Sequence, residues 1–394
     1  MPSKPQMGVT ERRARLGVRH HLASRAHAEG PAAVARDLVA LHGTDPATVY
    51  LSIVARARDS TVAAIEDSLY VKRELLRMLG MRRTMFVVPD EFAPVVQAAC
   101  TRALAVRLRR QYQQILADAG VVSDVEAWWT RVSNDTLAAL EQRREATAQE
   151  LGQDVPELKT QIRLAEGKNY AGTQSVATWM LMQLSAEGKI VRGRPRGTWI
   201  SSQYRWAPID AWLPRGLAEL STPAAQMTLV QRWLRAFGPG TLDDLKWWTG
   251  LTMGDVRRAV QSLDLVEVEL GEGTGLVLAD DLDPVAPPDP WAALLPALDV
   301  TAMAYVQRDW FLGSHAPALF DRSGNIGPSV WCDGRIVGGW SQRPNGTIAI
   351  KLLEDVGNAA EERVAAAAHA LEDWLGSVRV TPRFRTPLER ELSV

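Results

Sequence analysis

Two helix-start signals lie eleven residues apart in this chain, and they restrict the local fold to few possibilities. Thr241 is followed three positions later by Asp244, and Thr252 by Asp255, which is the spacing of a capping box. A short helix, a tight turn at Gly250 and a second helix to about Ser262 therefore predict a helix-turn-helix. Alternating apolar residues follow, and they predict a β-hairpin over Val266-Val268-Leu270 and Leu276-Leu278. Together these elements have the outline of a winged helix.

The same order of elements recurs twice more, without any repeat at the level of residues. Helical spacing over Ser175 to Ala186 is followed by predicted strands at Ile190-Val191 and Thr198-Trp199-Ile200, so the Arg-Gly-Arg-Pro-Arg-Gly segment between them would be the wing. A third copy is expected near the N-terminus, ending in the strand Met85-Phe86-Val87-Val88. Capping-box spacing marks two further helix starts, at Ser123/Glu126 and Thr147/Glu150.

The C-terminal part changes to alternating strands followed by a helix. The predicted strands are Ser329-Val330-Trp331, Arg335-Ile336-Val337 and Thr347 to Ile350, with a hairpin turn at Asp333-Gly334 and a helix over Ala359 to Leu375. A proline-rich segment, 283–290, separates this part from the rest. We expect a mainly α protein with small β elements (α+β) and four regions: 8–165, 166–222, 223–284 and 285–394.

Composition indicates an ordinary globular protein. Of the 394 residues, 46% are hydrophobic and 23% charged. Cys100 and Cys332 are far apart and lack Cys-x-x-Cys spacing, so we expect no zinc site, and a reducing cytoplasm fits best. We expect neither a signal peptide nor a membrane span, because no long apolar run is present. Apolar spacing favours core positions for most of the 14 tryptophans, including Trp179, Trp233, Trp247 and Trp331.

The net charge of -1 does not by itself indicate a nucleic-acid partner, so such a partner would have to bind local basic patches. The longest patch, residues 188–206, contains no acidic residue. Its cations are Lys189, Arg192, Arg194, Arg196 and Arg205. A second patch contains Lys72, Arg73, Arg77, Arg82 and Arg83, and a third contains Arg379, Arg383 and Arg385.

Residues 42–50, His-Gly-Thr-Asp-Pro-Ala-Thr-Val-Tyr, are the strongest candidate for chemistry. His42, Thr44 and Asp45 place an imidazole, a hydroxyl and a carboxylate within four positions, which is sufficient to hold and activate one water molecule. A purely structural role is the alternative. Asp45 before Pro46 is also a good helix N-cap, and His42 could close the preceding helix.

Several motifs together resemble the AlkZ/YcaQ-type DNA glycosylases, and the resemblance runs from about residue 10 to the end. The motifs are Leu38 to Arg58, Met81-Arg82-Arg83-Thr84, Arg192 to Gly197, Gly238-Pro239, Trp247-Trp248-Thr249-Gly250, Trp331 to Trp340, and Thr381 to Leu388. The resemblance implies tandem winged helices that form a C-shape, closed by a small C-terminal β-barrel. It also implies removal of bulky alkylated purines from double-stranded DNA without a metal, a cofactor or a lysine nucleophile.

The catalytic motif differs from that of most relatives. His42, Gly43 and Thr44 stand where most members have Gln-apolar-Gln or Gln-apolar-Asp, and Phe86 replaces a common histidine. The variant resembles the His-x-Thr/Ser form of glycosylases that confer antibiotic self-resistance, such as those acting on trioxacarcin-type adducts. An N7-alkylguanine or N3-alkyladenine is already a good leaving group, so the enzyme needs only to stabilise an oxocarbenium-like sugar and deliver water. Asp45 and His42 suit these tasks, and Thr44 would hold the water or a phosphate.

We expect basic and hydroxyl side chains to contact the DNA. We also expect the protein to be a monomer, and to recognise the duplex around the adduct rather than to enclose a fully flipped base. The predicted DNA-binding residues are Arg82, Arg83, Arg192, Arg194, Arg196, Ser201, Ser202 and Gln203. The competing function is that of a non-catalytic winged-helix regulator or adduct-shielding protein. A serine or cysteine hydrolase is disfavoured, because the chain has no Gly-x-Ser-x-Gly motif and no cysteine near a histidine.

Overall fold

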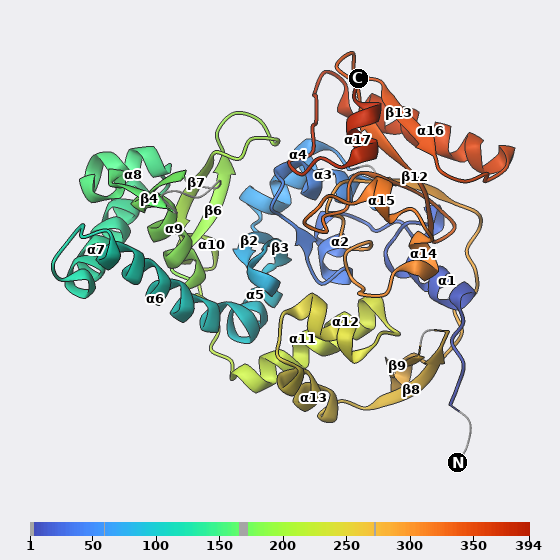
Figure 1. Cartoon of the computed structure of the whole chain (residues 1–394), viewed down its shortest axis with the longest axis horizontal. Coiled ribbons are helices and arrows are strands. Elements are labelled where there is room, and N and C mark those ends of the chain that lie inside the picture. Colours follow the sequence, from blue (N-terminus) through green and yellow to red (C-terminus); the bar gives the residue numbers. More distant parts are fainter. Residues whose placement is uncertain (1–3, 59, 165–171, 272) are drawn as a thin grey trace.

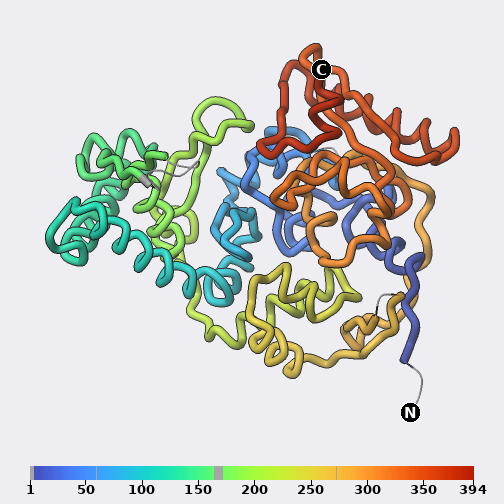
Figure 2. Tube along the Cα trace, in the orientation of Figure 1, coloured from blue at the N-terminus to red at the C-terminus, as the bar shows by residue number. Residues whose placement is uncertain are grey.

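A computed structural model describes residues 4–58, 60–164, 172–271 and 273–394 (Figure 1). Helices predominate and the β-sheets are small, as the sequence predicts. The N-terminal region contains α1 (Val9–Arg19), α2 (Pro31–Asp37), β1 (Leu41–His42), α3 (Pro46–Val54), α4 (Val62–Glu66), β2 (Leu75–Leu79), β3 (Met85–Pro89) and α5 (Ala93–Val96). The Cα trace shows this region at the centre of the molecule, with the later segments arranged around it (Figure 2).

One sheet joins the N-terminal region to the basic hairpin. Its strand order is β1-β3-β2-β6-β7, with β6 at Ile190–Pro195 and β7 at Tyr204–Pro208. His42 pairs with Phe86 across β1 and β3, and Arg77 pairs with Arg192 across β2 and β6. The two segments that the sequence analysis singled out are therefore parts of a single sheet.

A helical arm extends from this sheet, at the left of Figure 1. It contains α6 (Arg102–Asp118), α7 (Val125–Arg143), α8 (Ala148–Asp154) and α9 (Val176–Ala186). The rings of Tyr112 and Trp179 stack at 5.4 Å in its core. The predicted capping box at Thr147 is confirmed. The helix start predicted at Ser123 is wrong by one residue: the N-cap of α7 is Asp124, whose carboxylate accepts the Ala127 N–H.

The region that gave the strongest sequence signal folds as predicted. Here α11 (Thr222–Phe237) precedes α12 (Leu242–Thr249), α13 (Met253–Gln261), β8 (Leu265–Leu270) and β9 (Gly273–Leu278). The capping box of Thr241 and Asp244 begins α12, and Gly250 ends it in the left-handed conformation that glycine favours. β8 and β9 form the predicted antiparallel hairpin.

The C-terminal region contains the three predicted strands and one more, in an open sheet. The order is β10-β11-β12-β13, all antiparallel, and no pairing between β10 and β13 closes it within the described part of the chain. These strands therefore do not form the predicted barrel. Their bounds and those of the helices are β10 (Ala292–Leu295), β11 (Ser329–Cys332), β12 (Arg335–Gln342), β13 (Ile348–Leu352), α14 (Asp309–Leu312), α15 (Ala316–Leu319), α16 (Asn358–Leu375) and α17 (Pro387–Leu392).

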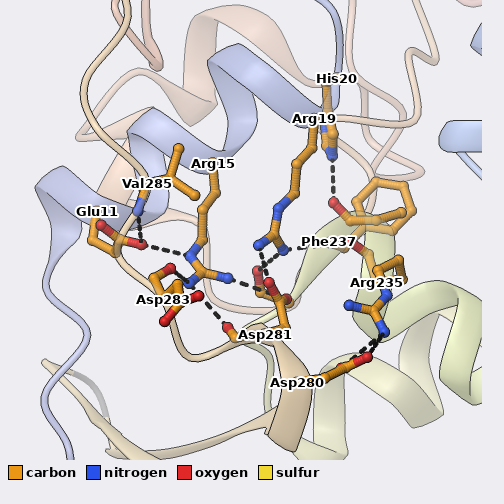
Figure 3. A network of polar contacts seen from close by, with 12 residues as sticks. Glu11, Arg15, Arg19, His20, Arg235, Phe237, Asp280, Asp281, Asp283 and Val285 are labelled. Atoms are coloured by element: carbon orange, nitrogen blue, oxygen red, sulfur yellow. Dashed lines mark hydrogen bonds and ion pairs between the residues drawn. The ribbon is translucent and has the colours of Figure 1, made fainter.

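A polar network attaches α1 to the segment that follows β9 (Figure 3). Arg15 Nη1 donates to Asp281 Oδ2 at 3.2 Å, and Arg19 also contacts this carboxylate, through Oδ1. Glu11 accepts from Arg15 Nε at 2.7 Å and from the Val285 backbone N–H at 2.9 Å. Since Arg15 is almost fully buried, these contacts compensate its desolvation while joining distant parts of the sequence.

Most tryptophans are buried, as the apolar spacing predicts, including Trp179, Trp233 and Trp331. Trp247 is the exception and corrects the prediction: it lies on α12 and is 37% exposed. In the described residues, no helix is both long enough and apolar enough to cross a lipid bilayer.

Candidate active site

The His42–Asp45 loop connects β1 to α3 and is held from two sides. The Gly43 N–H donates to the Met85 carbonyl at 2.8 Å, and the Gly43 carbonyl accepts from Arg77 Nη1 at 3.2 Å. A Cβ at Gly43 would lie 3.2 Å from Arg77 Nη1 and 3.3 Å from the Phe86 carbonyl carbon. Glycine therefore permits the close approach of this loop to β3, and Pro46 then begins α3.

Asp45 is buried, and both of its carboxylate oxygens accept backbone hydrogen bonds. Oδ1 accepts from the Ala47 N–H at 3.1 Å, so the predicted helix cap is present. Oδ2 accepts from the Arg383 N–H at 2.9 Å, from the C-terminal segment. A carboxylate oxygen has more than one acceptor position, so capping and a role toward a substrate are compatible.

His42 is equally buried, and its ring lies 5.6 Å from that of Phe86. Burial and the nearby charge of Arg82 lower the pKa of His42 to about 4, so the imidazole is neutral at pH 7. The Thr44 N–H points to Nδ1 at 3.4 Å, and this contact assigns the proton of the neutral ring to Nε2. In this arrangement His42 presents an N–H donor, which suits orientation of a water molecule better than removal of its proton.

A cavity of about 20 Å³ adjoins this loop. That volume is enough for one water molecule, which needs a space of roughly 10–15 Å³ for its centre. Its polar lining residues are Asp45, Thr48, Ser341, Gln342 and Thr381. Carboxylate, hydroxyl and amide groups therefore surround a water-sized space next to the start of α3.

Arg82 and Arg83 lie in the turn between β2 and β3. Both have positive φ angles, 52° and 59°, which side chains larger than glycine seldom adopt. The turn leads into β3, whose Met85 carbonyl accepts the Gly43 N–H at 2.8 Å, so it lies near the candidate catalytic loop. Arg82 and Arg83 both line a cavity of about 410 Å³ between the turn, α6 and the α12–α13 region.

The predicted wing residues lie partly in a strand and partly in an exposed loop. Arg192 and Arg194 belong to β6 rather than to an exposed loop, which corrects the sequence interpretation. Arg192 stacks over the rings of Tyr204 and Trp206, and burial lowers its pKa to about 10. Arg194 forms an ion pair with Glu66 on α4. The guanidinium groups of both residues thus already have protein partners.

The loop between β6 and β7 spans residues 196–203, and it carries the other four predicted contacts. Arg196, Ser202 and Gln203 are exposed, and Ser201 is half-buried. The predicted strand Thr198-Trp199-Ile200 is wrong, because Trp199 is buried within this loop and its ring lies 4.8 Å from Tyr50 and 5.5 Å from Trp374. These aromatic contacts pack the loop against α3 and α16, so residues 198–200 do not pair as a strand.

Sequence reasoning did not identify a buried cluster behind the catalytic loop. Arg77 lies over the ring of Tyr204, directly across the sheet from Arg192. No hydrogen-bond partner is found among the described residues for Arg77 Nε or for the hydroxyls of Tyr50, Tyr70 and Tyr204. Only the topology brings these residues together, and the sequence offered no signal beyond the basic character of Arg77 and Arg192.

α3 is fixed to the C-terminal region by a fully buried ion pair. Arg56 donates from Nη1 to Asp299 Oδ2 at 2.9 Å and from Nη2 to Oδ1 at 2.7 Å, and Ser52 Oγ donates to Oδ2 at 2.8 Å. This bidentate arrangement keeps the Asp299 pKa below its usual range despite burial. The helix that Asp45 caps therefore has a rigid attachment, which keeps the candidate site in a defined geometry.

Comparison with known proteins identifies the family and the fold. Residues 35–374 match the model of a family described as DNA glycosylase AlkZ-like. The structure is similar to that of Streptomyces sahachiroi DNA glycosylase AlkZ, with a TM-score of 0.73 and 16% sequence identity, covering 96% of this chain and 99% of that one. No curated protein sequence matches. Because the family model covers far more than half of the chain, the protein belongs to the AlkZ-like DNA glycosylases, and it is an enzyme of that class.

Proposed function

We propose that the protein is a monofunctional glycosylase that hydrolyses the N-glycosidic bond of bulky alkylated purines, N7-alkylguanine or N3-alkyladenine, in double-stranded DNA. Its biological role would be DNA repair or self-resistance to a genotoxic natural product. The observation that carries the proposal is the water-sized cavity lined by Asp45, beside a loop that also holds the neutral imidazole of His42.

Asp45 would provide negative charge for the sugar as it becomes oxocarbenium-like. The alkylated purine leaves with its bonding electrons and neutralises its own positive charge, so the protein need not supply a strong acid. Water then adds to C1′, and its proton passes to the Asp45 carboxylate, which releases it to solvent. The Nε2–H of His42 would orient this water, and Thr44 would hold it or a neighbouring phosphate.

Burial of the site supports recognition of the duplex rather than of an isolated base. His42 and Asp45 are each only 7% exposed, and the adjoining cavity has room for a water but not for a large adduct. We infer that a bulky lesion remains largely outside the protein while its glycosidic bond approaches the loop. This would differ from glycosylases that enclose a fully flipped base.

DNA contacts would come from the turn at Arg82 and Arg83 and from the loop at Arg196, Ser201, Ser202 and Gln203. We assign tandem winged helices to 8–165, 166–222 and 223–284, followed by the C-terminal unit 285–394. The helix-turn-helix of α12 and α13 with the β8–β9 hairpin supports the third of these assignments. The protein would act as a monomer.

A purely structural role for Asp45 is the alternative, and one observation favours it. Both oxygens of Asp45 already accept backbone N–H groups, as a purely structural cap would. Incubation with a duplex that contains one N7-alkylguanine, followed by mild alkali, tests the proposed substrate. Excision leaves abasic sites that break in alkali and releases the modified base for mass spectrometry. Tight binding without either product would contradict the proposed substrate.

A further inference from the structure

Three segments that are distant in sequence converge on one exposed indole. Trp247 lies on α12, Arg82 in the turn between β2 and β3, and Arg308 just before α14. The Cζ atom of Arg82 is 4.4 Å from the Trp247 ring centroid, and that of Arg308 is 5.7 Å from it. Arg308 also lies 5.1 Å from the ring of Phe320. Two guanidinium groups are thus held beside the same aromatic side chain.

Within the described ranges, no ion pair involves Arg82 or Arg308, and Arg82 Nε lacks a hydrogen-bond partner. Arg308 Nε donates to the Tyr305 carbonyl at 2.7 Å. The carboxylate of Asp244 lies near Arg308 and offsets part of its charge, but its hydrogen bonds come from Thr241 and from the Val306 N–H. One carboxylate therefore faces two guanidinium groups, and the cluster keeps a net positive charge.

The electrostatics show the cost of this arrangement. Burial lowers the pKa of Arg82, and burial together with the charge of Arg82 lowers the pKa of Arg308. Two partly desolvated cations that repel one another are unfavourable unless an anion joins them. Stacking of the guanidinium groups on the indole offsets part of this cost.

The backbone holds Arg82 in place. Its φ angle of 52° is unusual for arginine, and α12 packs closely against it. A Cβ at Gly250 would lie 3.0 Å from the Arg82 nitrogen and 3.1 Å from its Cγ. Strained residues of this kind persist where the surroundings fix them, and they concentrate at functional sites.

We propose that Arg82, Trp247 and Arg308 form a binding site for a backbone phosphate of the DNA strand that enters the candidate active site. The guanidinium fork matches a phosphate in geometry and charge, and the phosphate supplies the missing counterion. Arg82 lies in the turn that leads into β3, and Met85 of β3 accepts the Gly43 N–H, so this site is near the catalytic loop. The inference adds Trp247 and Arg308 to the predicted DNA contacts, and it rests on the proposed function only in taking DNA as the ligand.

The test is a salt titration of binding to an undamaged duplex, followed by fluorescence anisotropy. Log affinity falls as log salt concentration rises, and loss of one phosphate contact reduces the magnitude of this slope by roughly one. We expect this decrease for Arg82→Gln and for Arg308→Gln, whereas Arg308→Lys keeps most of the slope. Trp247→Ala should lower the slope although it removes no charge, because the two guanidinium groups lose their platform, and Trp247→Phe should restore most of it.

Arg25→Gln is the matched control, because Arg25 is an exposed cation already paired with Asp289. Its slope should equal that of the unmodified protein. Thermal melts of every variant, followed by circular dichroism, show that the fold is retained. A slope for Arg308→Gln equal to that of the control would overturn the proposal, as would an unchanged slope for folded Trp247→Ala. Since undamaged DNA is used, failure to excise alkylated bases would contradict the proposed function and leave this result intact.

Discussion

The carboxylate of Asp45 accepts a hydrogen bond from the backbone N–H of Arg383, at 2.9 Å and across 338 positions of sequence. The same carboxylate caps α3 through Ala47. The candidate active site is therefore completed by the C-terminal segment, which lies against a loop near the N-terminus. This contact gives the acidic side chain a single orientation, which catalysis by a fixed charge requires.

The buried pair of Arg56 and Asp299 should dominate the stability of the α3 attachment. Asp299→Asn leaves a guanidinium buried without its counterion, so we expect a loss of about 3–5 kcal/mol in the free energy of unfolding. Asp280→Asn breaks the exposed pair with Arg235 and should leave the free energy of unfolding nearly unchanged. Urea unfolding of both variants provides the comparison. Similar small losses would show that the buried pair has no special role.

His42 should make stability sensitive to acid. Its folded-state pKa of about 4 lies below the ordinary value of 6.5, so the unfolded chain binds more protons between these limits. The contribution is complete above pH 6.5 and is lost as the pH falls toward 4, by about 2 kcal/mol between pH 7 and pH 5. The pKa of His20 is lowered to about 3, so this residue also contributes to the loss of stability as the pH falls.

Replacement of His42 isolates its share of this loss. His42→Asn removes the titrating group and leaves His20 unchanged, so the variant should lose about 2 kcal/mol less than the unmodified protein between pH 7 and pH 5. Urea unfolding at the two pH values measures the difference. Equal losses in the two proteins would mean that His42 is not buried as a neutral ring.

The hairpin arginines should contribute unequally to DNA binding. Arg196 is exposed, so Arg196→Ala should lower the salt slope of duplex binding by roughly one. Arg194 is already paired with Glu66, so Arg194→Ala should have a smaller effect, and Glu66→Gln should strengthen binding by releasing that cation. Anisotropy titrations of the three variants test this order. An equal slope change for Arg194→Ala and Arg196→Ala would contradict it.

Local signals explain which parts of the fold could be predicted. Capping side chains and alternating apolar residues identified α8, α12, α13 and the β8–β9 hairpin, because these elements are specified by neighbours in sequence. The strand predicted at Trp199 was wrong because a long-range aromatic contact with Tyr50 determines that segment. Trp247 fits an apolar helical pattern, yet it is exposed, and its ring lies beside two arginines rather than in the apolar core.

The candidate site was predicted only where its residues are contiguous. His42, Thr44 and Asp45 share one short loop, so their proximity follows from the sequence itself. Arg77, Tyr204 and Arg383 reach the same region from a central strand, an edge strand and the C-terminal segment. No spacing rule connects such positions, since only the sheet order and the packing of the C-terminal region bring them together.

The central claim is that Asp45 acts on the glycosidic bond, beyond capping α3. Asp45→Asn removes the charge and keeps one oxygen to cap α3, whereas its amide nitrogen cannot accept the Arg383 N–H, so a thermal melt must accompany the activity assay. Asp124→Asn is the matched control, since Asp124 caps α7 in the same way, through the Ala127 N–H, on the exposed surface.

The decisive measurement is the single-turnover rate of base release from a duplex with one N7-alkylguanine, together with the affinity for that duplex. We predict that Asp45→Asn slows excision by at least about a hundredfold and leaves affinity nearly unchanged, because loss of an electrostatic or general-base contribution typically costs this much. Asp124→Asn should retain both. An unaltered rate in Asp45→Asn, or a decrease in excision matched by an equal loss of binding, would contradict the claim and leave Asp45 a structural cap.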